Sequence, residues 1–270
     1  MFLRDLENFI DEDIGYNDVS CSIIPDCKVQ GKVVSNEDGI VAGLGEATQV
    51  FEFFDVFVVT DFADGLEIKK NDVIFTLEGG ARSLLRGERL ALNFLGRMSG
   101  IATLTRRYVN AAGGIKIAGT RKTTPGFRKF EKKAIIAGGG DPHRFNLSDA
   151  VMIKDNHIAV LGLEKALGAA KKTAGFTQKI EVEVEDADSA VHAVELGADI
   201  IMFDNMSVEE IKRGIKMLEE KGLRQHIILE ASGGITLDKA GDYAGTGIDV
   251  ISIGGLTHSS KWLDFSLRIK

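Results

Sequence analysis

Positively charged side chains are concentrated in one stretch of the chain, residues 115–154. This stretch carries nine Lys and Arg residues and only three Asp and Glu residues, although the whole chain has a formal net charge of −7. Such a group of cations in an acidic protein favours a small, multiply anionic ligand held at close range. The cations that fall at expected strand ends or beside Gly and Pro turns are Arg121, Lys122, His143, Arg144 and Lys154.

Three other lysines of this stretch, Lys129, Lys132 and Lys133, lie in a helical pattern. A run of charges on a helix is usually a solvated face, so we interpret these lysines as helix surface. The glycines at 138–140 follow this helix. One glycine would suffice for a helix C-cap, and the additional ones predict a mobile loop or a close approach to a ligand.

Carboxylates alternate with apolar residues in the segment IEVEVED. A strand here places Glu181, Glu183 and Glu185 on one face. Buried parallel strands are normally continuous apolar runs, so these glutamates must meet cations, a metal or water. Asp204 ends the next apolar segment and would join Glu183. Paired carboxylates are typical Mg²⁺ ligands, whereas salt bridges to the cations named above are the alternative.

Two pairs of glycines follow the last two apolar segments of the chain. They occur in EASGGI and SIGGL. Consecutive glycines at the strand ends of the last two units of a barrel favour a phosphate that is bound by backbone N–H groups. The candidate phosphate residues are Ser232, Gly233, Gly234, Gly254 and Gly255.

Several common functions lose support from the sequence. The chain has no G-x-x-x-x-G-K-[ST] loop, no strand-borne G-x-G-x-x-G and no G-x-S-x-G elbow, which argues against ATP hydrolysis, nicotinamide redox chemistry and serine-hydrolase chemistry. The acidic charge, and the lack of aromatic residues among the cations beyond Phe127, Phe130 and Phe145, argue against a nucleic-acid partner.

The compartment is predicted from cysteine usage and the chain start. Cys21 and Cys27 have no second Cys/His pair near them, so we expect no zinc site and a reduced, cytoplasmic protein. The first residues become acidic at once and do not form a signal peptide. The apolar runs are too short to cross a membrane, so no membrane partner is expected.

The elements that must position these residues change in type along the chain. Residues 1–105 predict an α+β domain: a short N-terminal helix, strand pairs around turns at 36–39 and 70–72, and two helices broken near Ser99–Gly100. Residues 106–259 predict the catalytic domain, and the tail at about 260–270 is expected to pack back on the first domain.

Six short apolar segments in residues 106–259 alternate with helical patterns, which indicates parallel strands with helical crossovers. The segments are 115–118, 151–153, 180–184, 200–203, 227–229 and 250–253. A doubly wound open sheet and an incomplete barrel both allow six units. Polar or glycine residues follow every segment, beginning with Thr120-Arg121-Lys122 and including Glu185-Asp186. In an open sheet only the loops at the switch point would carry such residues, so their presence in all six loops favours the barrel.

The chain resembles the quinolinate phosphoribosyltransferase family, the carboxylating nicotinate-nucleotide pyrophosphorylases. The resemblance rests on motifs in this order: EDIGYNDVS, RGERLALNFLGRMSGIATLT, TRKTTPG, GGGDPHR, LSDAVMIKDNH, EVEVED, MFDN, EASGGI and ISIGGLTHS. It implies an α/β fold in which an N-terminal α+β sandwich-like domain precedes an incomplete, six- or seven-stranded βα barrel. It also implies transfer of phosphoribosyl from phosphoribosyl pyrophosphate to quinolinate, with decarboxylation, in NAD biosynthesis.

The resemblance further implies residue roles and an assembly. Arg121, Lys122, His143, Arg144 and Lys154, with Thr120 beside them, would line the quinolinate pocket. Glu183 and Asp204 would bind the ribose hydroxyls and Mg²⁺. The 5′-phosphate would be bound by Ser232, Gly233, Gly234, Gly254 and Gly255. We expect Lys122, Lys154, Glu183 and Asp204 to act in catalysis. A homodimer with shared active sites is implied, or a hexamer built as a trimer of dimers, with Arg89 supplied by the partner subunit.

Two residues depart from the family pattern, and two other functions remain as alternatives. Pro142 and Asn146 stand where many members have Asn and Gly, and Pro142 stiffens the approach to His143. The alternatives are a related phosphoribosyltransferase for another acidic heterocycle, such as nicotinate, and a phospho-sugar lyase or isomerase barrel.

Overall fold

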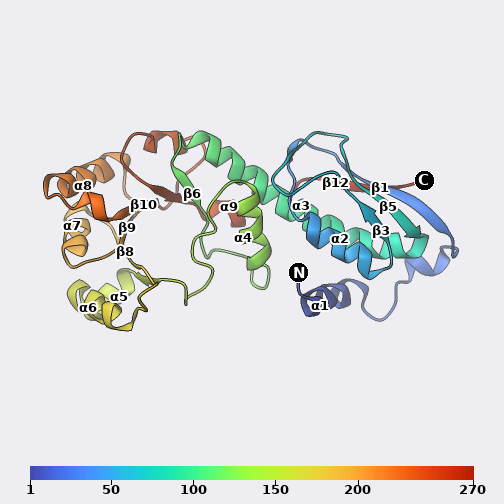
Figure 1. Ribbon diagram of the computed structural model, residues 1–270, viewed down its shortest axis with the longest axis horizontal. Helices are drawn as coiled ribbons and strands as arrows, with labels where there is room; N and C mark the ends of the chain where they lie inside the picture. The colour runs from blue at the N-terminus through green and yellow to red at the C-terminus, as the bar shows by residue number, and fades with distance from the viewer. The chain divides into compact units, whose positions relative to one another are not determined.

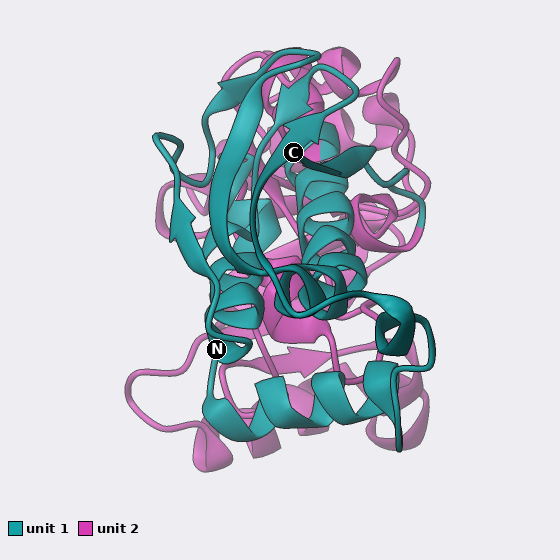
Figure 2. Ribbon diagram, turned by 90° about the vertical axis from the view of Figure 1, so that its right-hand side faces the viewer, with its two compact units in different colours: residues 1–104, 133–139, 259–270 teal, residues 105–132, 140–258 magenta.

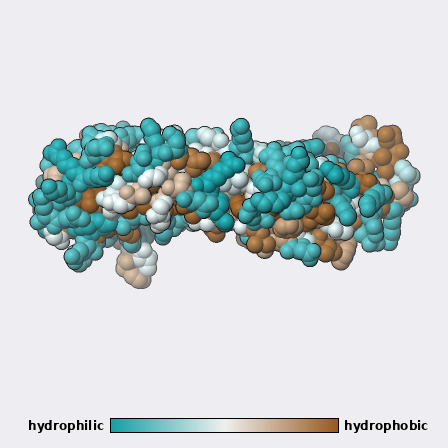
Figure 3. Space-filling view, turned by 90° about the horizontal axis from the view of Figure 1, so that it is seen from above, coloured by the Kyte–Doolittle hydropathy of each residue, from teal (hydrophilic) through white to brown (hydrophobic).

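The chain forms two compact units in a computed structural model that describes residues 1–270 (Figure 2). Unit 1 comprises residues 1–104, 133–139 and 259–270, and unit 2 comprises residues 105–132 and 140–258. None of the helices combines the length with the apolar composition that a membrane-spanning segment needs. Figure 3 shows a surface on which hydrophilic side chains predominate and apolar atoms form scattered patches.

Unit 1 contains a four-stranded antiparallel sheet in the order β12-β1-β5-β3 (Figure 1). Its strands are β1 (Lys28–Ser35), β3 (Phe57–Val59), β5 (Val73–Gly80) and β12 (Phe265–Ile269). A separate pair joins β2 (Gly39–Ile40) to β4 (Glu67–Ile68). The predicted local strand pairs are wrong, because β1 pairs with β5 and β12 rather than with its neighbour along the chain.

Three α-helices accompany this sheet: α1 (Leu3–Ile14), α2 (Leu44–Phe53) and α3 (Ala81–Ala111). A short 3₁₀ turn, η1, covers Ser20–Ile23. The predicted break near Ser99–Gly100 is wrong, since α3 runs through it without interruption. Gly100 serves close packing instead: a Cβ there would lie 2.0 Å from the carbonyl oxygen of Lys261, so only glycine lets the C-terminal segment cross the helix.

Unit 2 is built on six parallel strands in the order β6-β11-β10-β9-β8-β7. They are β6 (Lys116–Ala118), β7 (Val151–Ile153), β8 (Ile180–Val184), β9 (Ile200–Asp204), β10 (Ile228–Ser232) and β11 (Val250–Ser252). The first strand lies beside the last, which is the cyclic order of a βα barrel, but β6 and β7 do not pair. The expected fold class is confirmed, with six strands and an open edge.

Helices follow the strands of unit 2, and Figure 1 shows α6, α7 and α8 on the outer side of the sheet. Besides α4 (Arg128–Ala137), whose residues 133–137 belong to unit 1, the helical elements are α5 (Asp155–Leu161), α6 (Leu163–Thr173), α7 (Ala187–Glu195), α8 (Val208–Glu220), α9 (Gly255–His258), η2 (Arg224–His226) and η3 (Ala240–Tyr243). The fully buried Val182, Ile201 and Leu229 pair side by side on β8, β9 and β10 and form the apolar layer of the sheet. The next residue along each strand therefore faces the opposite, inner side.

Candidate active site

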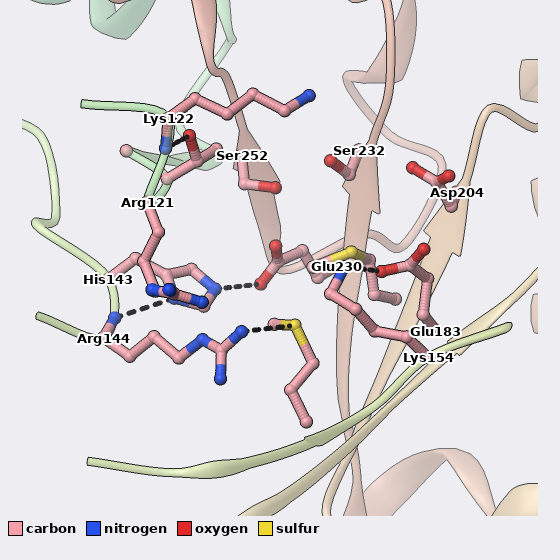
Figure 4. Close-up of a pocket in the computed structure, with 14 residues that line it drawn as sticks. Arg121, Lys122, His143, Arg144, Lys154, Glu183, Asp204, Glu230, Ser232 and Ser252 are labelled. Carbon is pink, nitrogen blue, oxygen red and sulfur yellow. Dashed lines mark hydrogen bonds and ion pairs between the residues drawn. The ribbon is translucent and has the colours of Figure 1, made fainter. Parts of the chain in front are cut away.

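A cavity of about 350 Å³ opens at the carboxyl ends of the six strands of unit 2 (Figure 4). Figure 4 shows Arg121, Lys122, His143 and Arg144 on one side, and Glu183 and Asp204 on the other, where Lys154 pairs with Glu183. This is the end at which βα-barrel enzymes place their active sites. The lining residues are Gly119, Thr120, Arg121, Lys122, His143, Arg144, Met152, Lys154, Glu183, Met202, Asp204, Glu230, Ser232 and Ser252.

The strand register brings the polar side chains to matched levels on the inner face. Glu183 of β8 pairs with Met202 of β9, and Met202 pairs with Glu230 of β10. Two residues further along, the neighbouring strands contribute Asp204, Ser232 and Ser252. Because side chains alternate between the two faces of a strand, these two levels point into the same cavity.

Two arginines approach each other on the cationic side. Burial, together with the nearby charge of Arg121, lowers the pKa of Arg144 below its ordinary value. The Nε atom of Arg121 is buried and makes no hydrogen bond within the protein. Two guanidinium groups this close repel each other, and an anion between them would relieve the repulsion and satisfy the buried donor.

His143 is held in an unusual backbone conformation, with φ of 55°. Its N–H donates to Asp141 Oδ1 at 2.7 Å, and its Nδ1 accepts from the N–H of Arg144 at 2.7 Å. Its Nε2 lies 3.2 Å from Glu230 Oε2 and 4.0 Å from Glu181 Oε2. An accepting Nδ1 places the ring proton on Nε2, directed at Glu230. Burial lowers the pKa of His143, but the hydrogen bond to Glu230 and both carboxylate charges outweigh it, so the pKa is raised.

A pair of buried carboxylates lies beside His143. Glu181 and Glu230 are 1% and 3% exposed. Burial and the charge of Glu230 raise the pKa of Glu181 to about 7. One oxygen of each carboxylate makes no hydrogen bond. The pair of carboxylates formed by Glu181 and Glu230 therefore takes up a proton readily near neutral pH.

Glu181→Gln is expected to stabilise the protein in a pH-dependent way. The raised pKa means that the folded state binds a proton which the unfolded state releases near pH 4.5, so the wild type loses stability as pH rises from about 4.5 to 7. The amide avoids this loss, and at pH 8 the variant should gain on the order of 2 kcal/mol in its free energy of unfolding. Thermal unfolding at pH 5 and pH 8 checks this, with the exposed Glu185→Gln as control. A gain of equal size at both pH values would contradict it.

The carboxylate side of the cavity is made by Glu183 and Asp204. Lys154, the N-cap residue of α5, forms an ion pair with Glu183. Burial and the charge of Glu183 raise the pKa of Asp204. Glu185, predicted on the same face, is exposed beyond the end of β8, and Asp186 accepts the N–H of Ser189 as the N-cap of α7. Among the acids predicted at the ends of β8 and β9, Glu183 and Asp204 therefore remain as the candidates to contact a ligand.

The cavity brings together most of the residues predicted for it: Thr120, Arg121, Lys122, His143, Arg144, Lys154, Glu183, Asp204 and Ser232. The glycines lie at its margin. Gly233 and Gly234 line an adjacent hollow of about 650 Å³, and both have positive φ. Gly254 lies against the side chain of Lys122, and Gly255 begins α9.

Arg89 is exposed on α3 and belongs to unit 1. It lines a small hollow of that unit together with Asn93 and Trp262. Arg89 is therefore not among the residues that line the cavity of unit 2.

Comparison with known protein families places both parts of this chain in one family. Residues 16–99 match the quinolinate phosphoribosyl transferase N-terminal domain, and residues 101–268 match the C-terminal domain of the same family. The chain belongs to the quinolinate phosphoribosyl transferase family.

Several members of this family match the chain over most of its length. The probable nicotinate-nucleotide pyrophosphorylase [carboxylating] of Methanothermobacter thermautotrophicus is 45% identical, over 98% of each chain. The nicotinate-nucleotide pyrophosphorylase [carboxylating] of Homo sapiens is 41% identical, over 89% of this chain and 82% of its own. The crystal structure of NadC from Streptococcus pyogenes is 42% identical with a TM-score of 0.93, over 99% of this chain and 95% of its own.

Sequence reasoning missed five residues that line the cavity of this quinolinate phosphoribosyl transferase chain: Gly119, Met152, Met202, Glu230 and Ser252. Glu230 had a detectable signal, because an acidic residue inside the apolar strand ILEAS is as costly to bury as Glu181 and Glu183 in β8. The two methionines had none, since apolar residues are expected in any buried strand.

One prediction about the lysines of α4 is wrong. Lys132, interpreted as helix surface, is 2% exposed. Its ammonium donates to the backbone carbonyls of Pro142 and Arg144, and burial lowers its pKa to about 8. Helical periodicity locates Lys132 on a face of the helix but does not show which backbone carbonyls fold against that face. Lys133, by contrast, is exposed and pairs with Glu46 at 2.5 Å.

Proposed function

We propose that this chain transfers the phosphoribosyl group of phosphoribosyl pyrophosphate to quinolinate and releases nicotinate mononucleotide, pyrophosphate and CO₂. The reaction class is inferred from family membership. The observation that supports the assignment within the chain is the division of one cavity into a cationic and a carboxylate side. A dicarboxylate needs the first side, and a ribose with a metal-bound pyrophosphate needs the second.

Quinolinate would lie against Arg121, His143 and Arg144, with Lys122 and Lys154 at its edges. The two repelling guanidinium groups and the unsatisfied Arg121 Nε are suited to bidentate carboxylate binding. The ring of His143, whose orientation Glu230 holds, would lie beside the carboxylates of the substrate. These contacts would fix both carboxylates of the ring and direct its nitrogen at the anomeric carbon of the ribose.

The transfer itself requires positioning and charge more than proton transfer. As the bond from ribose C1 to pyrophosphate breaks, positive charge grows on the sugar and negative charge on the leaving group. Lys122 and Lys154 would stabilise the latter. The ring nitrogen forms the new bond to C1 and becomes quaternary, so it withdraws the electron pair left when the C2 carboxylate departs as CO₂. A proton from solvent then replaces that carboxylate on the ring.

Mg²⁺ fits the carboxylate side of this cavity. Glu183 and Asp204 lie near the ends of adjacent strands. Burial, together with the negative charge of Glu183, raises the pKa of Asp204, and a cation bound there would favour the ionised carboxylate. These two residues would hold the ion together with substrate oxygens. When bound, Mg²⁺ supplies positive charge to the pyrophosphate. Glu183 and Asp204 would also accept hydrogen bonds from the ribose hydroxyls.

The 5′-phosphate would bind at the late glycines. Gly233 and Gly234 have φ of 95° and 61°, in the left-handed region that favours glycine. A Cβ on Gly233 would lie 2.2 Å from Asn205 Oδ1, so no larger residue fits there. Ser232, these two glycines and the pair Gly254–Gly255 would supply a hydroxyl and backbone N–H groups to the phosphate.

Incubation with quinolinate, phosphoribosyl pyrophosphate and Mg²⁺ tests the proposal. We expect nicotinate mononucleotide and CO₂ in equal amounts. Turnover of nicotinate without CO₂ would indicate the phosphoribosyltransferase for another acidic heterocycle. A Lys adduct trapped by borohydride, without pyrophosphate release, would indicate the lyase. Either result in place of CO₂ release would overturn the assignment.

We also propose a cytoplasmic homodimer in which Arg89 completes the active site of the partner subunit. Free cysteines fit a reducing compartment, and burial raises the pKa of Cys21 to about 11, which keeps it unreactive. The edge strand β3 exposes the apolar Phe57 and Val59, and an uncovered apolar edge favours a protein partner.

Subunit mixing tests the shared site. Arg89→Ala and Lys122→Ala should each be inactive alone, whereas a heterodimer of the two keeps one intact site. Random mixing should therefore restore roughly a quarter of wild-type activity if the interface is isologous. Native mass spectrometry would verify that heterodimers form. Heterodimers without activity would contradict the role of Arg89.

A further inference from the structure

We propose that one face of α4 clamps the two loops that carry the site cations, and that Arg128, Glu131 and Lys132 are positioning residues for the dicarboxylate. The first loop is residues 120–124, with Arg121 and Lys122. The second loop is residues 141–145, with His143 and Arg144. This inference rests on the proposed function for its substrate, but the clamp itself is a property of the contacts described below.

The spacing of the three residues places them together. Positions i, i+3 and i+4 of a helix are neighbours on one face, so Arg128, Glu131 and Lys132 form a single charged strip on α4. Glu131 and Lys132 are 0% and 2% exposed. Charged side chains are rarely buried to this degree unless every one of them is paired.

Glu131 holds the first loop. Its Oε2 accepts the backbone N–H of Thr124 at 3.0 Å, and its Oε1 accepts the Thr124 hydroxyl at 3.0 Å. Thr124 follows Lys122 by two residues. A carboxylate bound to a backbone N–H in a buried setting fixes the path of the chain as well as that of one side chain.

Lys132 holds the second loop on both sides of His143. Its Nζ donates to the carbonyl oxygen of Pro142 and, at 3.0 Å, to that of Arg144. His143 between them has φ of 55°, a left-handed conformation that is strained for a residue other than glycine and persists only where the surroundings enforce it. Lys132 therefore helps to maintain the conformation that presents the imidazole and the Arg144 guanidinium to the cavity.

Arg128 contacts both loops. Its Nε donates to Thr123 Oγ1 at 2.9 Å in the first loop, and its Nη1 donates to the carbonyl oxygen of Phe145 at 3.2 Å in the second. The loops need such a link because Arg121 and Arg144 repel each other. Without it, relaxation of the loops would separate the two guanidinium groups that must bind one ligand.

Steady-state kinetics of Lys132→Met test the clamp. Misplacement of the second loop should raise the KM for quinolinate by roughly 10- to 100-fold, while the KM for phosphoribosyl pyrophosphate stays within about twofold. Lys132→Arg, which keeps donors for the two carbonyls, should recover part of the loss. The exposed Lys216→Met on α8 is the matched control and should behave as wild type. Equal rises in both KM values, or no rise, would overturn the proposal.

Hydrogen exchange separates the clamp from the proposed function. In Lys132→Met the amides of residues 141 and 143–146 should exchange faster. In Glu131→Gln the amides of residues 121–124 should exchange faster. The amides of residues 228–232 should stay unchanged in both variants. If the wild type does not use quinolinate but exchange changes in this pattern, the proposed function fails and the clamp stands. If quinolinate is turned over but the loops exchange as in wild type, the clamp fails. Arg128→Gln, in which the altered side chain is half-buried, provides the same readout should Lys132→Met not fold.

Discussion

Arg144→Ala and Lys122→Ala should each abolish turnover of quinolinate while the protein stays folded. Arg144 and Arg121 both line the cationic side of the cavity, and in the proposed complex removal of Arg144 would leave one carboxylate of the ring without a bidentate partner. Loss of Lys122 would remove positive charge from the place where we propose that the pyrophosphate departs. A site that works by positioning and electrostatics should lose at least about 10³-fold in kcat/KM from either change.

Initial rates of nicotinate mononucleotide formation measure this effect, and thermal unfolding confirms that each variant is folded. Lys216→Ala, which removes an exposed lysine from α8, is the control and should leave the rate unchanged. Arg144→Lys adds a second comparison. It keeps the charge but loses the planar pair of donors, so it should remain far below wild type. Normal rates in the alanine variants would remove the basis of the assignment.

Glu183→Gln and Asp204→Asn should produce the second large loss, and it should appear in the use of Mg²⁺ and phosphoribosyl pyrophosphate. Each change removes one negative charge from the pair that ends β8 and β9. It also releases Lys154 from its ion pair in the case of Glu183. We expect kcat/KM for phosphoribosyl pyrophosphate to fall by roughly 10²- to 10⁴-fold, with a higher Mg²⁺ concentration needed for half-maximal rate.

Glu185→Gln is the matched control for this prediction, because Glu185 lies two residues beyond Glu183 but is exposed outside the strand. Magnesium titrations of the three variants should separate the first two from Glu185→Gln. Identical magnesium dependence in all three would contradict a metal role for Glu183 and Asp204. Binding of quinolinate alone, followed by calorimetry, should be less affected than turnover, since we propose that its carboxylates contact the other side of the cavity.

Local patterns in the sequence predicted the elements of unit 2 well. The alternation of apolar strands with helical patterns identified β7 and β8 with their correct bounds. Such elements depend on the period of neighbouring residues, which a single sequence displays directly. The position of Arg121, Lys154 and Asp204 at strand ends followed from the same alternation. Their convergence on one cavity then required only that the strands run parallel.

Pairing between distant segments could not be predicted in this way. β1 lies between β5 and β12, whereas turn residues had suggested local hairpins. Gly100, which the sequence pattern treats as a helix break, instead provides a contact surface for Lys261. In both cases the deciding partner lies far along the chain, where local propensity carries no information about it.

The residue types of the site, their strand-end positions and the family membership were thus present in the sequence alone. The tertiary structure decided the state of the charged residues around them. Lys132 is buried because the carbonyls of Pro142 and Arg144 fold against it, and Glu230 matters because strand register places it beside His143. The cost of burying a charge depends on the partners that surround it in space, and these come from segments that no local pattern connects.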